Sequence, residues 1–364
     1  MSGLGPNGML AALKLRAEGF DVVAADQRPA YNRSIHLNLR RSWLETVRSL
    51  DATLAEKLAA VTTPIRAFER LPHHDAAPFR LKRESALARR LATQPELHVR
   101  LDELERVFCA HLVKLPGIEV LTHTRVTVDG SDVRLGDRRL EAPALIVAAE
   151  GGKSPTARQL GLSMVKVSAP RFYISVHVDH SVGPITRRLD VDGLSSWAVG
   201  HGDPARGTWL VLEIPEKVHA GRPSSTIDRE HFERGARQLL GVVPEPSAEG
   251  LRGTFRFEQQ LLPRPVAGSN VLFLGDSAGM GHHALGTGLE LGAWDIGFLR
   301  KGMSLEDHAA RVVEARIELL AFGMHEYYPS LAEDPTEWIR QAITQGTDAV
   351  SRLEARLTGL SRRA

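Results

Sequence analysis

Residues 271–295, with the sequence VLFLGDSAGMGHHALGTGLELGAWD, constrain the fold of this chain more than any other segment. An apolar run of strand length leads into Gly275-Asp276, and a glycine-rich stretch then opens a helix. A carboxylate at the end of a strand accepts hydrogen bonds from hydroxyl groups, while Gly286 and Gly288 let a ligand approach the free N–H groups of the helix start. We therefore expect these four residues to contact a hydroxyl-bearing ligand.

A second glycine motif lies at the start of the chain. Gly3, Gly5 and Gly8 satisfy the pattern GxGxxG, and a helical pattern and a short apolar strand follow them. That strand ends at Asp26, eighteen residues after Gly8, where a dinucleotide-binding fold places the acid that binds the adenosine ribose. Arg28 follows closely and is expected to bind the same ligand. This order predicts a Rossmann-like dinucleotide site.

One part of the N-terminal motif is missing, because only Met1 and Ser2 precede Gly3. The motif normally follows a central strand of about five residues. Without it, the neighbouring strands would carry unpaired backbone groups that cost about 1–3 kcal/mol each when buried. We expect the native start to lie upstream of Met1, and the alternative is a degenerate fold that has lost tight cofactor binding.

The two glycine motifs resemble those of the FAD-dependent aromatic hydroxylases, the class A flavoprotein monooxygenases that include kynurenine monooxygenase. The resemblance implies that the first motif holds the nucleotide half of one FAD and that the second holds its ribityl chain. Two positions depart from the family pattern, since His283 replaces a proline before the ring and Glu290 replaces an asparagine. The sequence GDSAG is more similar to the flavin-dependent geranylgeranyl reductases, which use the same fold to reduce alkenes.

The middle of the chain also resembles these hydroxylases. Apolar periodicity predicts helices over 39–60 and 97–115, and then a hairpin around Asp129-Gly130 and a buried strand over 144–149. In the family, an arginine near the start of the corresponding helix reaches the flavin. Arg100 matches that arginine, with a surface position on the helix as the alternative.

Residues 150–158 resemble the DG motif of the same family, which serves both FAD and NAD(P)H. Glu150 stands in place of the usual aspartate, and one extra residue separates Ser154 from Arg158. A plain turn before a helix, capped by Ser154, is the alternative.

Residues 170–265 consist of short alternating or apolar segments separated by glycine and proline, which predicts a second sheet. In the families that this chain resembles, such a sheet covers the flavin ring. We therefore expect four aromatic residues to line a substrate pocket, with packing in the core as the alternative: Tyr173, His177, Trp197 and Trp209.

Several classes of function are not favoured by the sequence. The net charge of +2 comes without a long basic run, which gives no support for nucleic acid binding. Cys109 is the single cysteine, so no disulfide forms within the chain, and a reduced cytoplasm is expected. No metal-ligand spacing and no apolar run of membrane-spanning length occur. His283, close to the second glycine motif, is the candidate catalytic residue, as an acid or hydrogen-bond donor.

We therefore expect an α/β fold in which a Rossmann-like FAD-binding domain is interleaved with a β-sheet substrate domain and followed by C-terminal helices. The FAD-binding domain would comprise residues 1–65, 95–165 and 265–302. The substrate domain would comprise 66–94 and 166–264, and the C-terminal helices 303–364. The chain would act as a monomer or homodimer on a small molecule.

The resemblance implies a monooxygenase of secondary metabolism that hydroxylates or epoxidises an aromatic or polyene compound with FAD, NAD(P)H and O2. A reductase of the geranylgeranyl type is the alternative within the enzymes, and GDSAG favours it. A flavin-fold protein that binds a ligand or guides a cyclisation without redox turnover is the alternative from another class. His283 and Glu290 favour that alternative.

Overall fold

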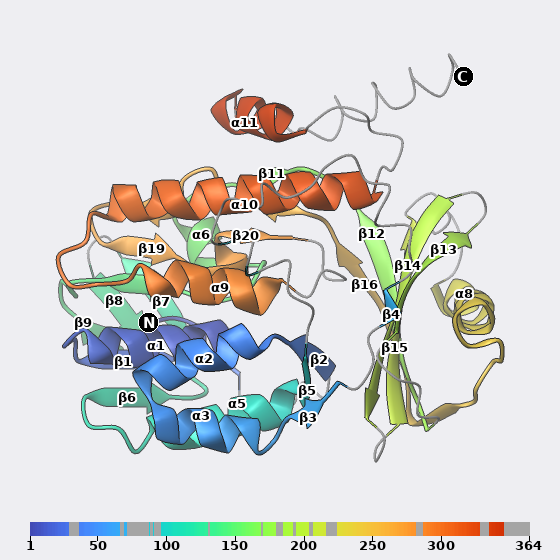
Figure 1. Cartoon of the computed structure of the whole chain (residues 1–364). Coiled ribbons are helices and arrows are strands. Elements are labelled where there is room, and N and C mark those ends of the chain that lie inside the picture. Colours follow the sequence, from blue (N-terminus) through green and yellow to red (C-terminus); the bar gives the residue numbers. More distant parts are fainter. Residues whose placement is uncertain are drawn as a thin grey trace.

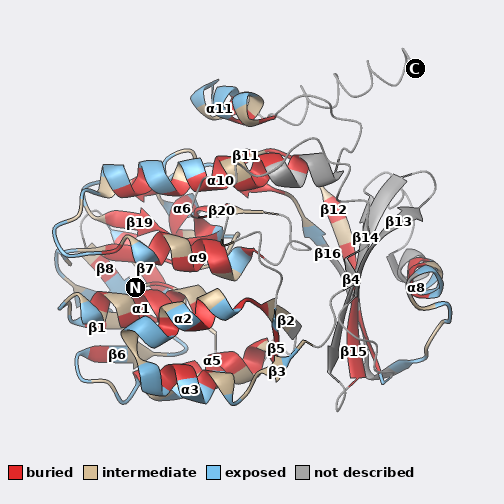
Figure 2. Ribbon diagram, in the orientation of Figure 1, coloured by how far each residue is buried: buried red, intermediate tan, exposed pale blue. Residues whose placement is uncertain are grey.

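The computed structural model describes residues 1–28, 36–65, 69–70, 87, 90, 96–129, 132–168, 170–179, 185–191, 194–203, 207–215, 224–281, 287–327 and 335–345. Two parts are visible in Figure 1: a larger part of layered helices and short sheets, and a tall antiparallel sheet beside it. Buried residues concentrate in the helices and strands at the centre of the larger part (Figure 2). The α/β fold class predicted from the sequence is confirmed.

Among the described residues, a parallel pair of strands and a three-stranded group make up the main sheet of the larger part. Their order is β6 (Ile118–Leu121) beside β1 (Val22–Ala25), and then β10 (Ile146–Ala148), β19 (Val271–Phe273) and β18 (Val266–Ala267). The inner strands are almost wholly apolar and buried, as expected for parallel strands that are covered on both faces.

The first three residues join the two halves of this sheet. Ser2 bridges in parallel to Ala25 on one side and to Ala148 on the other. Its N–H donates to Val147 at 2.8 Å, and the N–H of Gly3 donates to Ala25 at 2.8 Å. The carboxyl ends of β1 and β10 are therefore paired at the point where the sequence analysis expected an unfilled centre.

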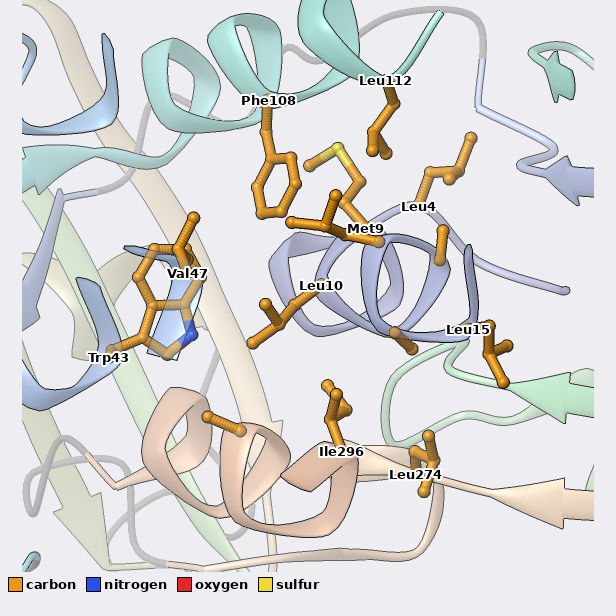
Figure 3. Close-up of a cluster of buried hydrophobic side chains, with 14 of the residues drawn as sticks. Leu4, Met9, Leu10, Leu15, Trp43, Val47, Phe108, Leu112, Leu274 and Ile296 are labelled. Carbon is orange, nitrogen blue, oxygen red and sulfur yellow. The ribbon is translucent and has the colours of Figure 1, made fainter. Parts of the chain in front are cut away.

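Helices cover this sheet and form the largest apolar core. They are α1 (Pro6–Ala17), α2 (Arg41–Leu50), α3 (Ala52–Ala59), α5 (Leu101–Leu112) and α9 (Gly288–Gly297). Figure 3 shows α1 in the middle of this core, with Phe108 and Leu112 of α5 on one side and Ile296 of α9 on the other. Trp43 of α2 meets the ring of Phe108 edge-on, at 6.3 Å between centroids.

Two predicted helices differ from the structure in their extent. Residues 97–100 form strand β5 (Leu97–Arg100), which pairs with β2 (His36–Leu39), so the helix begins at Leu101. The helix predicted over 39–60 is broken at Asp51, whose extended backbone lets its carboxylate cap α3 by accepting from the N–H of Leu54 at 2.8 Å. β3 (Thr63–Pro64) pairs with β5.

The second sheet predicted from the sequence is present. Its strands are β16 (Pro246–Phe257), β12 (Arg171–Val178), β15 (Gly207–Pro215), β14 (Leu194–Asp203), β13 (Ile185–Val191) and β4 (Glu69–Arg70), in that order. Helix α8 (Ser224–Leu240), which the sequence analysis did not predict, packs on its outer face through Phe232 and Ala236. The opposite face is turned toward the larger part (Figure 1).

The remaining elements surround these two sheets. The hairpin predicted around residue 129 is β7 (Val126–Asp129) and β8 (Asp132–Leu135), extended by β9 (Arg138–Leu140). A small sheet contains β11 (Val165–Lys166), β17 (Gln260–Leu261) and β20 (Gly279–Met280). The short helices are α6 (Pro155–Gln159) and the 3-10 turn η2 (Gly275–Ser277), and the C-terminal helices are α10 (Leu305–Tyr327) and α11 (Thr336–Gln345).

Candidate functional site

The N-terminal glycine motif forms a tight turn between the sheet and α1. Gly3 has φ +94°, and a Cβ there would lie 2.4 Å from the carbonyl oxygen of Ala149. A Cβ on Gly8 would lie 2.0 Å from the carbonyl oxygen of Gly3, so the first turn of α1 packs directly on the loop. Gly5 is the N-cap of α1. The turn therefore exposes a helix start of the kind that binds phosphate groups.

Asp26 lies at the end of β1, beside this turn. The N–H of Leu4 donates to its Oδ2 at 2.8 Å, and the backbone N–H of Arg28 donates to its Oδ1 at 2.8 Å. The Arg28 guanidinium adds bonds of 3.0 Å from Nε and 2.8 Å from Nη2. Burial favours a raised pKa for Asp26, but these hydrogen bonds outweigh it, so the pKa of Asp26 is lowered and the carboxylate stays charged.

The four donors together match the acceptor capacity of one carboxylate. Arg28 also contacts the buried Glu105 at 3.5 Å, which positions the guanidinium between two acids. A ribose hydroxyl that binds Asp26 would therefore share a carboxylate oxygen with the Arg28 guanidinium or displace one of its hydrogen bonds.

The second glycine motif forms the turn between β19 and α9. Gly275 has φ +58° and opens η2, which leaves Asp276 exposed. The Oδ1 of Asp276 lies 3.6 Å from the Cβ position of Gly288, the first residue of α9. The predicted carboxylate and the predicted helix start are thus neighbours, while Gly286 and His283 lie outside the described residues.

Asn7 brings the two motifs together. Its Nδ2 donates to the carbonyl of Gly288 at 3.1 Å, and a Cβ on Gly275 would lie 3.2 Å from the same nitrogen. Gly292 admits this contact, because a Cβ there would lie 1.9 Å from Nδ2. Asp26 therefore lies beside the start of α1 and Asp276 beside the start of α9, and Asn7 connects these two helix starts.

The residues around these helix starts fit FAD. Asn7 and the glycines around it bring two helix starts together, and each start has a carboxylate beside it. The Oδ1 of Asn7 is buried and has no hydrogen-bond partner among the described residues, so it is an acceptor available to a hydroxyl-bearing ligand. FAD would place its phosphate groups at a helix start and its hydroxyl groups at the carboxylates.

A buried ion pair supports the second motif. Arg316 of α10 donates from Nη1 to the Oδ1 of Asp295 at 2.8 Å and from Nη2 to Oδ2 at 2.6 Å. The same Nη2 donates to the carbonyl of Gly275 at 2.8 Å, and Asp295 accepts from the N–H of Gly275 at 3.0 Å. Both side chains are buried. Arg316 therefore holds the Gly275 turn from behind.

The segment that resembles the DG motif is held by its own hydrogen bonds. Glu150 accepts from the N–H of Thr156 at 2.9 Å and from the Thr156 and Ser154 hydroxyls at 2.8 and 3.3 Å. It also accepts from the Ser2 hydroxyl. Its backbone N–H donates to Ser277 at 2.7 Å, which ties this segment to the second glycine motif. Glu150 thus stabilises the turn before α6, and Ser154 caps that helix.

Arg100 lies at the end of β5 and is the N-cap of α5. Its Nε and Nη2 donate to Asp102 at 3.1 and 2.8 Å, and its side chain is partly exposed.

Three of the four aromatic residues predicted to line the substrate pocket are described with their side chains. His177 of β12 lies opposite Trp209 of β15, and their ring centroids are 5.2 Å apart. Tyr173 meets Phe257 edge-on at 5.7 Å. Tyr173 and His177 alternate with the β12 residues that pack on α8, so they belong to the face turned toward the larger part. Trp197 pairs with Arg188 in the sheet, and its side chain is outside the described residues.

A family model described as FAD binding domain matches residues 2–305 of this sequence. The chain belongs to this FAD binding domain family. Comparison with curated proteins finds no match. The family match and the fold together support a flavin-dependent oxidoreductase, with FAD as its cofactor.

Three solved structures are similar in fold to this chain. p-Nitrophenol 4-monooxygenase PnpA from Pseudomonas putida DLL-E4 has a TM-score of 0.67 and 20% identity, with 99% of this chain and 96% of that chain covered. The Diels-Alderase PyrE3 of pyrroindomycin biosynthesis gives 0.64 and 18%, with 98% and 79% covered. The tetrameric form of 2-methyl-3-hydroxypyridine-5-carboxylic acid oxygenase gives 0.64 and 16%, with 90% and 89% covered.

Two residues of the candidate site carry no signal in the sequence of this FAD-binding family member. Arg316 lies on an amphipathic helix with no motif around it, so only the three-dimensional contact with Asp295 reveals its position. Asn7 stands at a variable position within GxGxxG, and its bond to Gly288 depends on the packing of α1 against α9.

No helix in the described part of the chain combines the length and apolar character needed to cross a bilayer. Within the same residues, no three His, Cys, Asp or Glu side chains are grouped so that they could hold a metal ion.

Proposed function

We propose that this protein is an FAD-dependent monooxygenase that hydroxylates or epoxidises an aromatic or polyene small molecule, with NAD(P)H as reductant and O2 as oxidant. The observation that supports this most is that Asp26 lies beside the start of α1 and Asp276 beside the start of α9, and that Asn7 joins these two helix starts. Two of the similar structures are named as oxygenases of aromatic rings.

In this proposal, the α1 start and its glycines Gly3, Gly5 and Gly8 bind the pyrophosphate, because the free N–H groups and the helix dipole favour anions. Asp26 binds the adenosine ribose, with Arg28 in competition for the same oxygens. Asp276 accepts from the ribityl hydroxyls. Bound FAD would supply the redox chemistry, which no protein side chain offers.

The remaining assignments rest on the resemblance and on position. Arg100 would contact the flavin from the start of α5, and Gly275, Gly286 and Gly288 would allow the close approach of the ribityl chain. His283, next to the same turn in sequence, would act as an acid or hydrogen-bond donor to substrate.

The inner face of the second sheet would contact the substrate. His177 and Trp209 form an aromatic pair on this face, with Tyr173 two pleats along β12 and Trp197 on β14. Buried aromatic rings bind flat, apolar compounds and exclude water, which a reactive flavin requires. With Cys109 as the single cysteine, we also place the protein in a reducing cytoplasm, as a monomer or homodimer.

A second candidate is a ligand-binding or cyclising protein without redox turnover. One similar structure is named as a Diels-Alderase. The carboxylate of Asp26 already accepts four hydrogen bonds within the protein. This also favours the second candidate, since tight FAD binding would have to move Arg28.

The proposal is tested by supplying FAD-loaded protein with NADPH or NADH, in air, and with panels of phenols, anilines and polyenes. We expect NAD(P)H oxidation and O2 uptake to rise together only when a substrate is present, with one oxygen atom in the product. Reduction of an alkene without O2 would show a reductase instead, and a folded, flavin-free protein that binds and cyclises a polyene would establish the second candidate.

A further inference from the structure

Glu290 occupies the first turn of α9 and is 1% exposed. Its Oε1 accepts from the Ser42 hydroxyl at 2.9 Å, and its Oε2 accepts from the Nε of Arg90. Arg90 also donates from Nη2 to the Ser42 carbonyl at 3.1 Å and to the Thr46 hydroxyl at 2.7 Å. One guanidinium therefore connects α9 with α2.

A neighbouring contact holds the same stretch of chain on α9. Leu87, three residues before Arg90, is 3% exposed and packs in one cluster with Leu291 and Leu319. Leu87 and Arg90 thus dock on the adjacent positions 291 and 290 of α9. Both docking residues come from 66–94, which the sequence analysis assigned to the substrate domain.

A buried carboxylate at this position affects any flavin bound to the start of α9. An isolated buried charge is costly, and an arginine that pairs with it offsets that cost. A reduced flavin ring also carries negative charge, which the positive end of a helix stabilises and which a nearby carboxylate opposes. Arg90 cancels the charge of Glu290 in the turn that follows Gly288.

We propose that Arg90 is a positioning residue that balances the charge of Glu290 and thereby sets the relative affinity of this protein for reduced and oxidised flavin. This inference rests on the proposed function, because it requires FAD at the start of α9. Arg90 lies outside the segments assigned to the FAD-binding domain, so a residue from another part of the chain would control the relative affinity for the two flavin states.

The test compares Arg90→Met with the double variant Arg90→Met/Glu290→Gln. Arg41→Met is the matched control, since Arg41 begins α2 but pairs with the exposed Glu96 at 3.3 Å. The flavin midpoint potential is measured by dye-equilibrated reduction without O2, together with FAD affinity and the melting temperature. Arg90→Lys, which keeps the charge, provides a folded variant if the methionine variants melt too low.

We expect Arg90→Met to weaken binding of reduced relative to oxidised flavin about tenfold, which lowers the potential of the two-electron couple by about 30 mV. The double variant returns to the wild-type potential because no uncompensated charge remains, and Arg90→Lys and Arg41→Met stay close to wild type. A purely structural contact would lower the melting temperature and leave the potential unchanged.

Two results overturn the inference while the proposed function survives: Arg90→Met binds FAD with the wild-type potential, or the double variant keeps the full shift of Arg90→Met. A wild-type protein that binds no FAD at all overturns the proposed function and this inference with it.

Discussion

At the scale of single residues, the account depends most on glycines that no other residue can replace. Gly8 is the strongest case, because its Cβ position lies 2.0 Å from a backbone oxygen that no side-chain movement can relieve. Gly297, the exposed last residue of α9, offers a contrast, since nothing lies within 4 Å of its Cβ position.

We predict that Gly8→Ala lowers the free energy of unfolding by about 1–3 kcal/mol and weakens FAD binding strongly, because the α1 start must move away from the Gly3 turn. Gly297→Ala should change stability by less than about 1 kcal/mol, in the stabilising direction, and leave FAD binding intact. Urea denaturation and FAD titration measure both effects. Similar behaviour of the two variants would refute the role given to the turn.

At the scale of elements, α10 holds the second glycine motif through one ion pair. We predict that Arg316→Met costs about 3–5 kcal/mol of unfolding free energy, since it leaves the buried Asp295 without a counter-charge. Arg316→Met/Asp295→Asn should recover part of the loss. The exposed pair of Arg340 and Glu314 at 2.5 Å is the control, and Arg340→Met should cost less than about 1 kcal/mol.

Urea denaturation of the four proteins provides the test. Equal losses for Arg316→Met and Arg340→Met would mean that α10 does not support the Gly275 turn.

The same helix makes stability depend on pH. Burial lowers the pKa of His308; Asp295 acts in the opposite direction, and Arg316 and Arg311 add to the lowering. Neither ring nitrogen has a hydrogen-bond partner among the described residues. In the unfolded chain this histidine is protonated near pH 6.5, and in the folded chain it is protonated only at a lower pH. Neutral His308 therefore contributes fully to the free energy of unfolding above about pH 6.5, and this contribution is lost as the pH falls below that value.

We predict that the melting temperature falls as the pH drops from about 6.5 to 5, and that His308→Phe reduces this fall because phenylalanine fills the same buried site without titrating. Melting curves across this range check it. A variant with the wild-type pH profile would show that His308 does not contribute.

Sequence patterns among neighbouring residues predicted some helices and strands correctly and others only in part. The Asp129 hairpin and the helix after Gly5 are confirmed, because turn chemistry and glycine spacing are local properties. Residues 97–100 were predicted as helix, but they form β5, since pairing with β2 overrides their helical period. The outer helix α8 was missed among segments interpreted as strands.

For the candidate site, motifs proposed residues but did not predict their partners. Asp26 and Asp276 were found from spacing, whereas the Arg28 fork and the contacts of Arg316 and Arg90 were not. These contacts join segments far apart in the sequence, and no single-sequence pattern encodes them. The domain boundaries and the roles of the site residues stay predictions.

At the scale of the whole molecule, we propose that two segments separated by about 250 residues form one FAD site. The sheet topology makes this possible, because Ser2 and β19 both flank β10, and both glycine turns leave its carboxyl edge. One face of the second sheet is turned toward the larger part, which contains both turns (Figure 1).

The most direct measurement is the titration of flavin-free protein with FAD and, separately, with FMN, for the wild type and for Asp26→Asn. The account predicts one FAD per chain, FMN binding at least about tenfold weaker, and a smaller difference between the two in Asp26→Asn, since a lost hydrogen bond to a charged group is worth about 1.5–3 kcal/mol. Equal affinity of the wild type for FAD and FMN, or no binding of either, would contradict it.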